Sequence, residues 1–259
     1  MKKTIKVFLL TMSLLLFNFF TNSFSAYASD SPIMVEKEEY QEITDPYELL
    51  RLAIQQHKAD ITEYNYYIDN GCNGDIVVSQ LIENKIFSDG SQESLYATTS
   101  FLILDENNRQ VTMEQLLENN IEADLSGNIT LSGGNYNLAV SCTAYWEWQR
   151  QNNSTWARCT HTTNQVVGNT SGQYWITQMD CVFKASNVIW TEEPDVDQIF
   201  IDYPTPYVMY AVSNPNPSFY LDAPYFSEIA AGVYITYNDG TTYQIYIDIK
   251  AAINNSLHH

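Results

Sequence analysis

The first regular pattern of apolar positions predicts a helix that follows a run of acidic residues. Asp45 can cap a helix whose first position is Pro46, with Glu48 reaching back to the cap. The stripe that follows has helical spacing and consists of Leu50, Ile54, His57 and Ile61. We therefore expect an amphipathic helix packed against the rest of the fold.

Patterns typical of strands dominate the next part of the chain. Two runs rich in β-branched and aromatic residues between Ile76 and Leu104 flank a turn at 88–91, which predicts a long β-hairpin. Both faces of this hairpin carry apolar residues, so we expect a sheet that is covered on both sides. Thr112 and Gln115 form a capping-box pattern and predict a short helix between strands.

Three further strands and an irregular region are expected after this helix. The first strand alternates, with one apolar face made of Leu138, Val140, Cys142, Ala144, Trp146 and Trp148. The other two strands are expected at 156–161 and 174–183. One face of the strand at 174–183 carries Trp175, Met179, Cys181 and Phe183. Six of the eight prolines fall between Pro194 and Pro224, which predicts an irregular crossover or edge segments there.

The apolar positions of the last hairpin determine the length of its loop. A two-residue Asp-Gly loop would place the apolar sets of the two strands on opposite faces. A three-residue loop, 238–240, pairs Ile235 with Tyr243 and keeps both sets on one face. We therefore predict a type I turn whose glycine occupies the left-handed bulge position.

These patterns predict a mainly β protein, an antiparallel β-sandwich of immunoglobulin-like or similar type, with an N-terminal helix and one short helix between strands. We expect a single β-rich domain over residues 44–259, and two subdomains, 44–132 and 135–259, are the alternative. Residues 29–43 are acidic and offer no apolar face, so this segment is expected to be disordered.

Residues 1–28 have the three-part pattern of a signal peptide. Three lysines precede the apolar run Val7–Phe20, and Ala26–Ala28 is a small-x-small cleavage pattern. The run is too short for a spanning helix, the residue directly after the cleavage point is not a cysteine, and the last residues lack a hydrophobic tail. We expect a secreted, extracellular protein without a membrane anchor, and the short lysine-rich start favours a Gram-positive bacterium.

The chain is strongly acidic, which limits its partners. It holds 31 acidic and 12 basic residues, a formal charge of −19, and three of the lysines lie in the expected signal peptide. Such a surface repels polyphosphates, so nucleic acid is excluded as a partner. Anionic membranes and wall polymers would be repelled in the same way.

All four cysteines lie beyond the expected signal peptide, where export favours disulfides. We predict two of them. Cys142 and Cys181 lie on the apolar faces of their strands and form the favoured pair, which leaves Cys72 with Cys159. A zinc site is the alternative, but Cys159 and His161 offer only two ligands on one strand face.

The chain lacks the local motifs of common catalytic sites, namely the G-x-S-x-G elbow, the phosphate loop and H-E-x-x-H. His57 lies on the apolar stripe of the expected helix and is assigned to packing. His161 could form a dyad with Cys159 only if that thiol were reduced. No catalytic residue is assigned, and the sequence leans away from an enzyme.

Two groups of residues remain as candidate binding sites. Glu192, Asp195 and Asp197 lie in a proline-bearing loop, where they could bind calcium or simply be solvated. Trp148 and Trp156 flank a polar turn at the end of a hairpin, and aromatic planes beside amides suit a sugar-binding surface. Core packing is the competing interpretation for both rings.

The function expected from these features is a secreted, non-catalytic β-sandwich protein that binds an extracellular glycan, peptide or protein. The missing catalytic motifs favour this hypothesis. One alternative is an extracellular hydrolase that uses paired carboxylates. The other is a structural or effector protein of the cell envelope. Calcium is the one cofactor considered.

Overall fold

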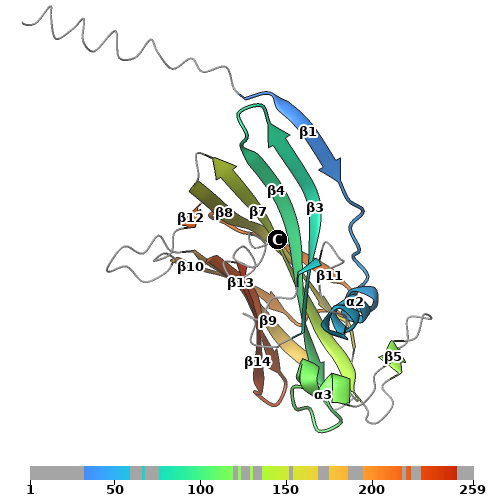
Figure 1. Ribbon diagram of the computed structural model, residues 1–259. Coiled ribbons are helices and arrows are strands. Elements are labelled where there is room, and N and C mark those ends of the chain that lie inside the picture. Colours follow the sequence, from blue (N-terminus) through green and yellow to red (C-terminus); the bar gives the residue numbers. More distant parts are fainter. Residues whose placement is uncertain are drawn as a thin grey trace, which may run out of the picture.

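The computed structural model describes residues 32–58, 66–67, 76–118, 122–123, 129–130, 136–151, 154–168, 175–185, 195–217, 220–222 and 229–249. Two antiparallel sheets form its two layers, and two short helices lie beside the larger one (Figure 1). The expected fold class, a mainly β antiparallel sandwich, is confirmed. The signal peptide predicted at 1–28 lies outside the described residues.

The larger sheet has the strand order β1-β3-β4-β7-β8-β11. These strands are β1 (Met34–Glu39), β3 (Val77–Phe87), β4 (Gln92–Leu104), β7 (Asn137–Gln151), β8 (Ser154–Val166) and β11 (Met209–Ser213). Two short strands extend it, since β2 (Tyr66–Tyr67) pairs with β3 and β12 (Tyr220–Asp222) pairs with β8. A separate ribbon joins β5 (Glu122–Ala123) to β6 (Ile129–Thr130).

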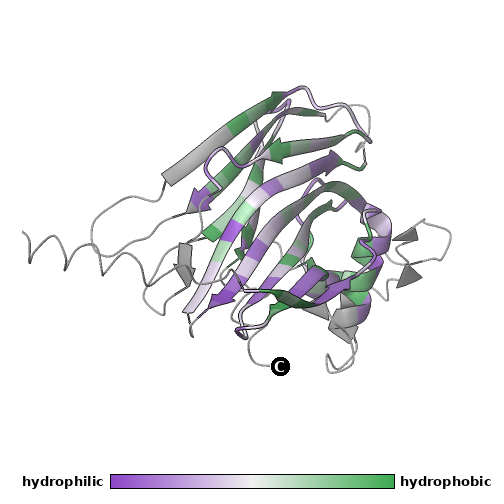
Figure 2. Ribbon diagram, turned by 90° about the horizontal axis from the view of Figure 1, so that it is seen from above, coloured by the Kyte–Doolittle hydropathy of each residue, from purple (hydrophilic) through white to green (hydrophobic). Residues whose placement is uncertain are grey.

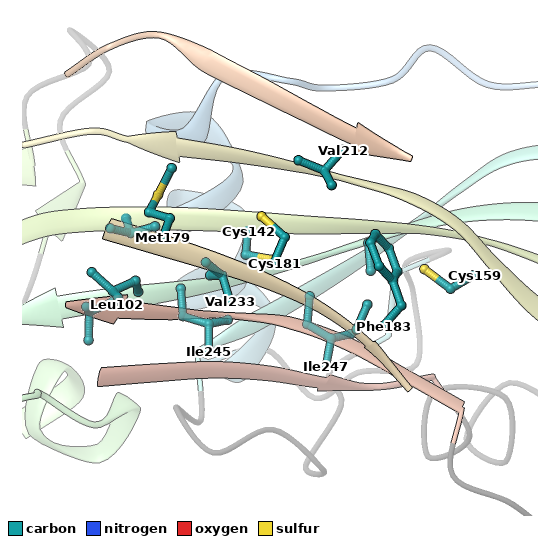
Figure 3. Close-up of a cluster of buried hydrophobic side chains, with 14 of the residues drawn as sticks. Leu102, Cys142, Cys159, Met179, Cys181, Phe183, Val212, Val233, Ile245 and Ile247 are labelled. Carbon is teal, nitrogen blue, oxygen red and sulfur yellow. The ribbon is translucent and has the colours of Figure 1, made fainter. Parts of the chain in front are cut away.

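The smaller sheet has the order β10-β9-β13-β14 and packs face to face on the larger one. Its strands are β9 (Ile176–Ala185), β10 (Asp195–Asp202), β13 (Ile229–Tyr237) and β14 (Thr242–Asp248). Figure 3 shows apolar side chains of both sheets in the layer between them. They include Met179, Phe183, Val233, Ile245 and Ile247 from the smaller sheet and Leu102, Cys142, Cys159 and Val212 from the larger. Apolar residues that alternate with polar ones along the strands, as the colours of Figure 2 show, form this core.

A second core lies on the other face of the larger sheet, under α2 (Pro46–Lys58) and α3 (Met113–Glu118). Leu50 and Ile54 of α2 pack there with Phe101 of β4. Val77 belongs to the core between the sheets, whereas its neighbour Val78 belongs to the core under the helices. The prediction of a hairpin covered on both faces is therefore confirmed at this end. No described helix is long and apolar enough to cross a membrane.

Both predicted helix caps are present. The Asp45 carboxylate accepts hydrogen bonds from the backbone N–H groups of Tyr47 (3.0 Å) and Glu48 (2.8 Å). The N–H of Thr112 donates to Gln115 Oε1 (2.9 Å), and the N–H of Gln115 donates back to Thr112 Oγ1 (3.4 Å). These contacts start α2 and α3 where the sequence predicted.

The last hairpin has the predicted loop and register. Ile235 pairs with Tyr243, and the N–H of Tyr237 donates to the carbonyl of Thr241 (2.9 Å), which leaves the three residues 238–240 as the loop. Gly240 has φ +86°, the left-handed conformation that this turn requires and that glycine adopts without a side-chain clash. Gly90 turns the hairpin between β3 and β4 in the same way, with φ +81°.

A bulge in β7 changes one predicted side-chain position. Leu102 pairs with Val140 and Ile103 pairs with Leu138, so Ala139 is an extra residue in β7. Leu138 consequently packs in the core under the helices, not between the sheets with the rest of its predicted face. Strict alternation predicted the opposite face because it allows for no inserted residue.

The segment 29–43, predicted to be disordered, contains strand β1. This strand pairs with β3, and all six of its residues are exposed. Lys37 also forms an ion pair with Glu83 of β3, with 2.8 Å between Nζ and Oε2. The prediction was wrong because it considered only apolar burial, whereas an edge strand is held through its backbone hydrogen bonds. The proline-rich region forms edge strands β10, β11 and β12, as expected.

Candidate functional site

The outer face of the larger sheet, which points away from the smaller sheet, carries polar and aromatic residues on its two longest neighbouring strands. Strand pairing places Gln149 beside Trp156, Glu147 beside Arg158, and Tyr145 beside His161. We call this set the outer strip: Tyr145, Glu147 and Gln149 of β7 and Trp156, Arg158 and His161 of β8. Because the opposite face of both strands is core, the backbone beneath the strip is firmly held.

One end of the strip is a stacked pair of rings. The ring centroids of Tyr145 and His161 are 4.2 Å apart, with an angle of 6° between the planes. The Tyr145 hydroxyl donates a hydrogen bond to Glu42, which lies between β1 and α2. Burial, and then this carboxylate, raise the pKa of Tyr145, while burial lowers the pKa of His161. Both rings are therefore uncharged near neutral pH.

The middle of the strip is an ion pair with well-defined geometry. Nη2 of Arg158 lies 2.6 Å from Oε2 of Glu147, and Nε donates to the same oxygen at 2.8 Å. The other guanidinium nitrogen, Nη1, donates to the backbone carbonyl of Pro217 at 3.3 Å. Such a partly exposed pair contributes about 1 kcal/mol or less to stability. Its main effect is to compensate both charges on this surface.

The far end of the strip carries an exposed indole beside an amide. Trp156 is 37% exposed, and it pairs with Gln149, whose Nε2 donates to Glu93 Oε1 at 3.1 Å. This arrangement offers an aromatic plane and neighbouring hydrogen-bonding groups on a strand held by the core. It can stack against a flat apolar face of a ligand that also carries hydroxyl groups.

The structure separates the two tryptophans predicted to bind a ligand together. Trp148 pairs with Ala157 and is 5% exposed in the core between the sheets. Trp156 is one residue before Ala157 and therefore points to the opposite face, where it joins the outer strip. Trp146 lies in the same core as Trp148, as its alternation predicted.

The two predicted disulfides are absent from the structure. Cys142, Cys159 and Cys181 are buried thiols, so the pairs Cys142–Cys181 and Cys72–Cys159 were both predicted wrongly. Cys72 itself lies outside the described residues. Two cysteines on apolar faces that pack together need not have the Cα separation and Cβ directions that a disulfide requires, and shared faces were the only basis for the prediction.

A bulge in β8 also separates Cys159 from His161. Tyr145 pairs with His161 and Trp146 with Cys159, so Thr160 is an extra residue between them. Cys159 consequently lies in the core and His161 on the outer strip, and they do not share the face that a zinc site or a dyad would need. The described residues contain no group of three metal-ligating side chains. The side chain of His57 lies outside them.

The predicted calcium group falls mostly outside the described side chains. Glu192 is not described, and only the backbone of Asp195 and Asp197 is. That backbone belongs to the start of edge strand β10, where Asp195 pairs with Ala185 and Asp197 with Phe183. The two aspartates therefore begin a strand, not a loop as predicted, and calcium binding there remains a prediction.

We expect the buried thiols to be inert in the folded protein. Burial is the largest cause that raises the pKa of Cys181, to about 12, and burial also raises that of Cys159. A rise from the ordinary value of about 9 makes the thiolate roughly a thousandfold scarcer near neutral pH. In a Cys72→Ser variant, titration with a thiol reagent should count three thiols in urea and almost none in buffer. Fewer than three in urea without reductant would indicate a disulfide.

Most of the outer strip was not recognised in the sequence. Tyr145, Glu147 and Gln149 occupy alternate positions of β7, opposite its apolar face, and this polar alternation was the available signal. The residues of β8 that pair with these three could not be assigned from the sequence, because the bulge at Thr160 shifts the register between the two strands. Comparisons of the chain with protein-family models, with curated proteins and with solved structures find no match.

Proposed function

We propose that this chain is a secreted, non-catalytic β-sandwich protein that binds an extracellular glycan through the outer strip. The observation that carries the proposal is the exposed ring of Trp156 beside the Gln149 amide, on a strand whose other face is core. An indole held in this way loses little conformational freedom when a ligand stacks on it. The glycan is preferred over a peptide or protein because hydroxyl-bearing ligands match the amide and aromatic groups together.

The charges of the strip favour binding over carboxylate catalysis. Glu42 accepts the hydrogen bond of Tyr145, and Glu147 is paired with Arg158. A hydrolase would need one carboxylic acid to donate a proton and a second carboxylate to act as base or nucleophile. Both of these carboxylates already have protein partners, so they suit positioning. A neutral glycan also avoids the repulsion that the acidic chain imposes on anionic ligands.

Trp156→Ala is expected to reduce retention on the polysaccharide that the protein binds. The native protein and the variant would be applied to insoluble cellulose, chitin and starch, and the bound fractions compared. Loss of one stacked ring weakens binding by about tenfold. The melting temperature should change by only a few degrees, because the ring is on the surface and no cavity opens.

Trp175→Ala is the matched control, since this tryptophan is also exposed but lies at the start of β9 in the smaller sheet. We expect it to bind like the native protein. Equal retention of native and Trp156→Ala proteins would show that the indole is not part of a binding surface. Failure of the native protein to bind any of the three polymers would count against the neutral glycan.

A further inference from the structure

A small pocket opens on the outer face of the larger sheet, between the connection to α2 and edge strand β11. Its floor consists of hydroxyl and amide side chains, namely Ser141, Thr143, Tyr145, Thr163 and Gln165. Its walls come from residues 42–44, Leu49 of α2 and Met209 of β11. The pocket encloses about 310 Å³ including its open mouth, and its interior has room for about one water-sized group.

Tyr207 lies next to this pocket, two residues before Met209 of its wall and hydrogen-bonded to Gln165 of its floor. Its backbone carbonyl accepts a hydrogen bond from Nε2 of Gln165 in the pocket floor, at 3.3 Å. Its hydroxyl is within electrostatic reach of Tyr47 on α2, where it adds to the rise in pKa that burial causes in Tyr47. The Tyr207 side chain is 65% exposed, and that of Met209 is 47% exposed. A thioether of the pocket wall and the ring of the neighbouring Tyr207 are therefore both exposed to solvent.

The backbone holds Tyr207 in a costly conformation. Its φ is +63°, in the left-handed region that bulky side chains seldom adopt. Three contacts fix the turn: Tyr207 N–H donates to the carbonyl of Val166 (2.7 Å), Val208 N–H to that of Thr205 (3.3 Å), and Thr205 N–H to the hydroxyl of Tyr210 (2.7 Å). Strained residues of this kind concentrate at binding sites, where the surrounding structure orients a side chain.

The pocket is lined by uncharged residues, with Glu42 as its one charged residue. No residue from 203 to 221 carries a charge, in a chain with 31 acidic residues. The one carboxylate in the pocket wall, Glu42, accepts a hydrogen bond from Tyr145 in the floor. The hydroxyl and amide side chains of the pocket floor, together with the aromatic ring of the neighbouring Tyr207, are complementary to a neutral polyhydroxylated ligand. A cation would need an uncommitted carboxylate, and an anion would be repelled by the acidic chain.

We infer that this pocket is a subsite for a neutral sugar residue, whose hydroxyl or hydroxymethyl group enters the pocket while its ring lies against Tyr207 and Met209. The inference rests on the proposed function, because the pocket and Trp156 share one face of β8. Gln165 lies nine positions after Trp156, which corresponds to roughly 30 Å of strand. A ligand that reaches both ends is therefore an oligosaccharide of several residues, not a single sugar.

The test replaces Tyr207 with glycine in the full secreted chain. Glycine suits φ +63°, so Tyr207→Gly removes the ring while the turn remains favourable and the melting temperature is maintained or raised. Calorimetry would measure affinity for cello-, chito- and malto-oligosaccharides of increasing length. We expect Tyr207→Gly to weaken binding of long oligosaccharides about tenfold and to leave short ones unchanged. Trp156→Ala should weaken both.

Tyr203→Gly is the matched control. Tyr203 is also left-handed, with φ +47°, and is 72% exposed, but its N–H bonds to Thr177 of the smaller sheet. It should bind all lengths like the native protein. Unchanged affinity of Tyr207→Gly for long oligosaccharides, with loss of retention in Trp156→Ala, would overturn the subsite and leave the proposed function standing. If no oligosaccharide bound to the native protein, and a protein ligand bound to the native protein but not to Tyr207→Gly, both proposals would be wrong.

Discussion

Trp146→Ala should lower the free energy of unfolding by about 3 to 5 kcal/mol. The indole is 1% exposed and lies in the core between the sheets. It stacks on Tyr96, with 4.4 Å between ring centroids and 10° between planes, and its Nε1 donates to Thr98 Oγ1 at 2.9 Å. Alanine would remove the stacking partner, one buried hydrogen bond and enough volume to leave a cavity.

Urea unfolding followed by circular dichroism measures this loss directly. Trp156→Ala is the control, because its ring lies on the outer strip, and we expect it to cost less than about 1 kcal/mol. Equal destabilisation by the two substitutions would show that Trp156 is also a core residue. That outcome would remove the residue on which the glycan proposal depends.

Gly232→Ala should destabilise the protein by about 3 kcal/mol or more, although it adds only one methyl group. Gly232 lies in β13 opposite Tyr246 of β14. A Cβ atom at this position would collide with the backbone carbonyl oxygen of Ile245 and come within 3.2 Å of the Tyr246 Cα. Because the obstacle is backbone, no rotamer change can relieve it, and the two strands would have to separate.

The glycine in the turn of the same hairpin provides the comparison. Gly240 has φ +86° and open space around the position of a Cβ, so alanine there meets only backbone strain. We expect Gly240→Ala to cost about 1 kcal/mol. Thermal unfolding of both variants would separate the two causes. Similar melting temperatures would mean that the close approach at Gly232 relaxes without loss of strand pairing.

Local structure could be predicted from the sequence where residues close together in the chain determine it. The caps at Asp45 and Thr112 depend on side chains within three residues of the backbone groups that they satisfy. The register of the last hairpin follows from two apolar sets and a glycine that lie within fifteen residues, 233–247, as the pairing of Ile235 with Tyr243 shows.

The candidate site could be predicted only in part. Trp156 was named from the sequence, but as the partner of Trp148, which the alternation of β7 directs into the core. His161 was considered beside Cys159, and the bulge at Thr160 instead stacks it on Tyr145. A bulge costs little and has no clear local signal, yet it reverses the face of every residue that follows.

Hydrophobic alternation, turn glycines and capping residues therefore determined the β-sandwich class, the hairpins and the helix starts, because each acts over a few residues along the chain. Tertiary structure alone decided that Cys142, Cys159 and Cys181 are buried thiols, which tryptophan reached the surface, and that Tyr207 meets the pocket floor at Gln165. These outcomes depend on the spacing of two packed sheets and on register shifts between strands. Both are set by how the whole core packs, which no short stretch of sequence encodes.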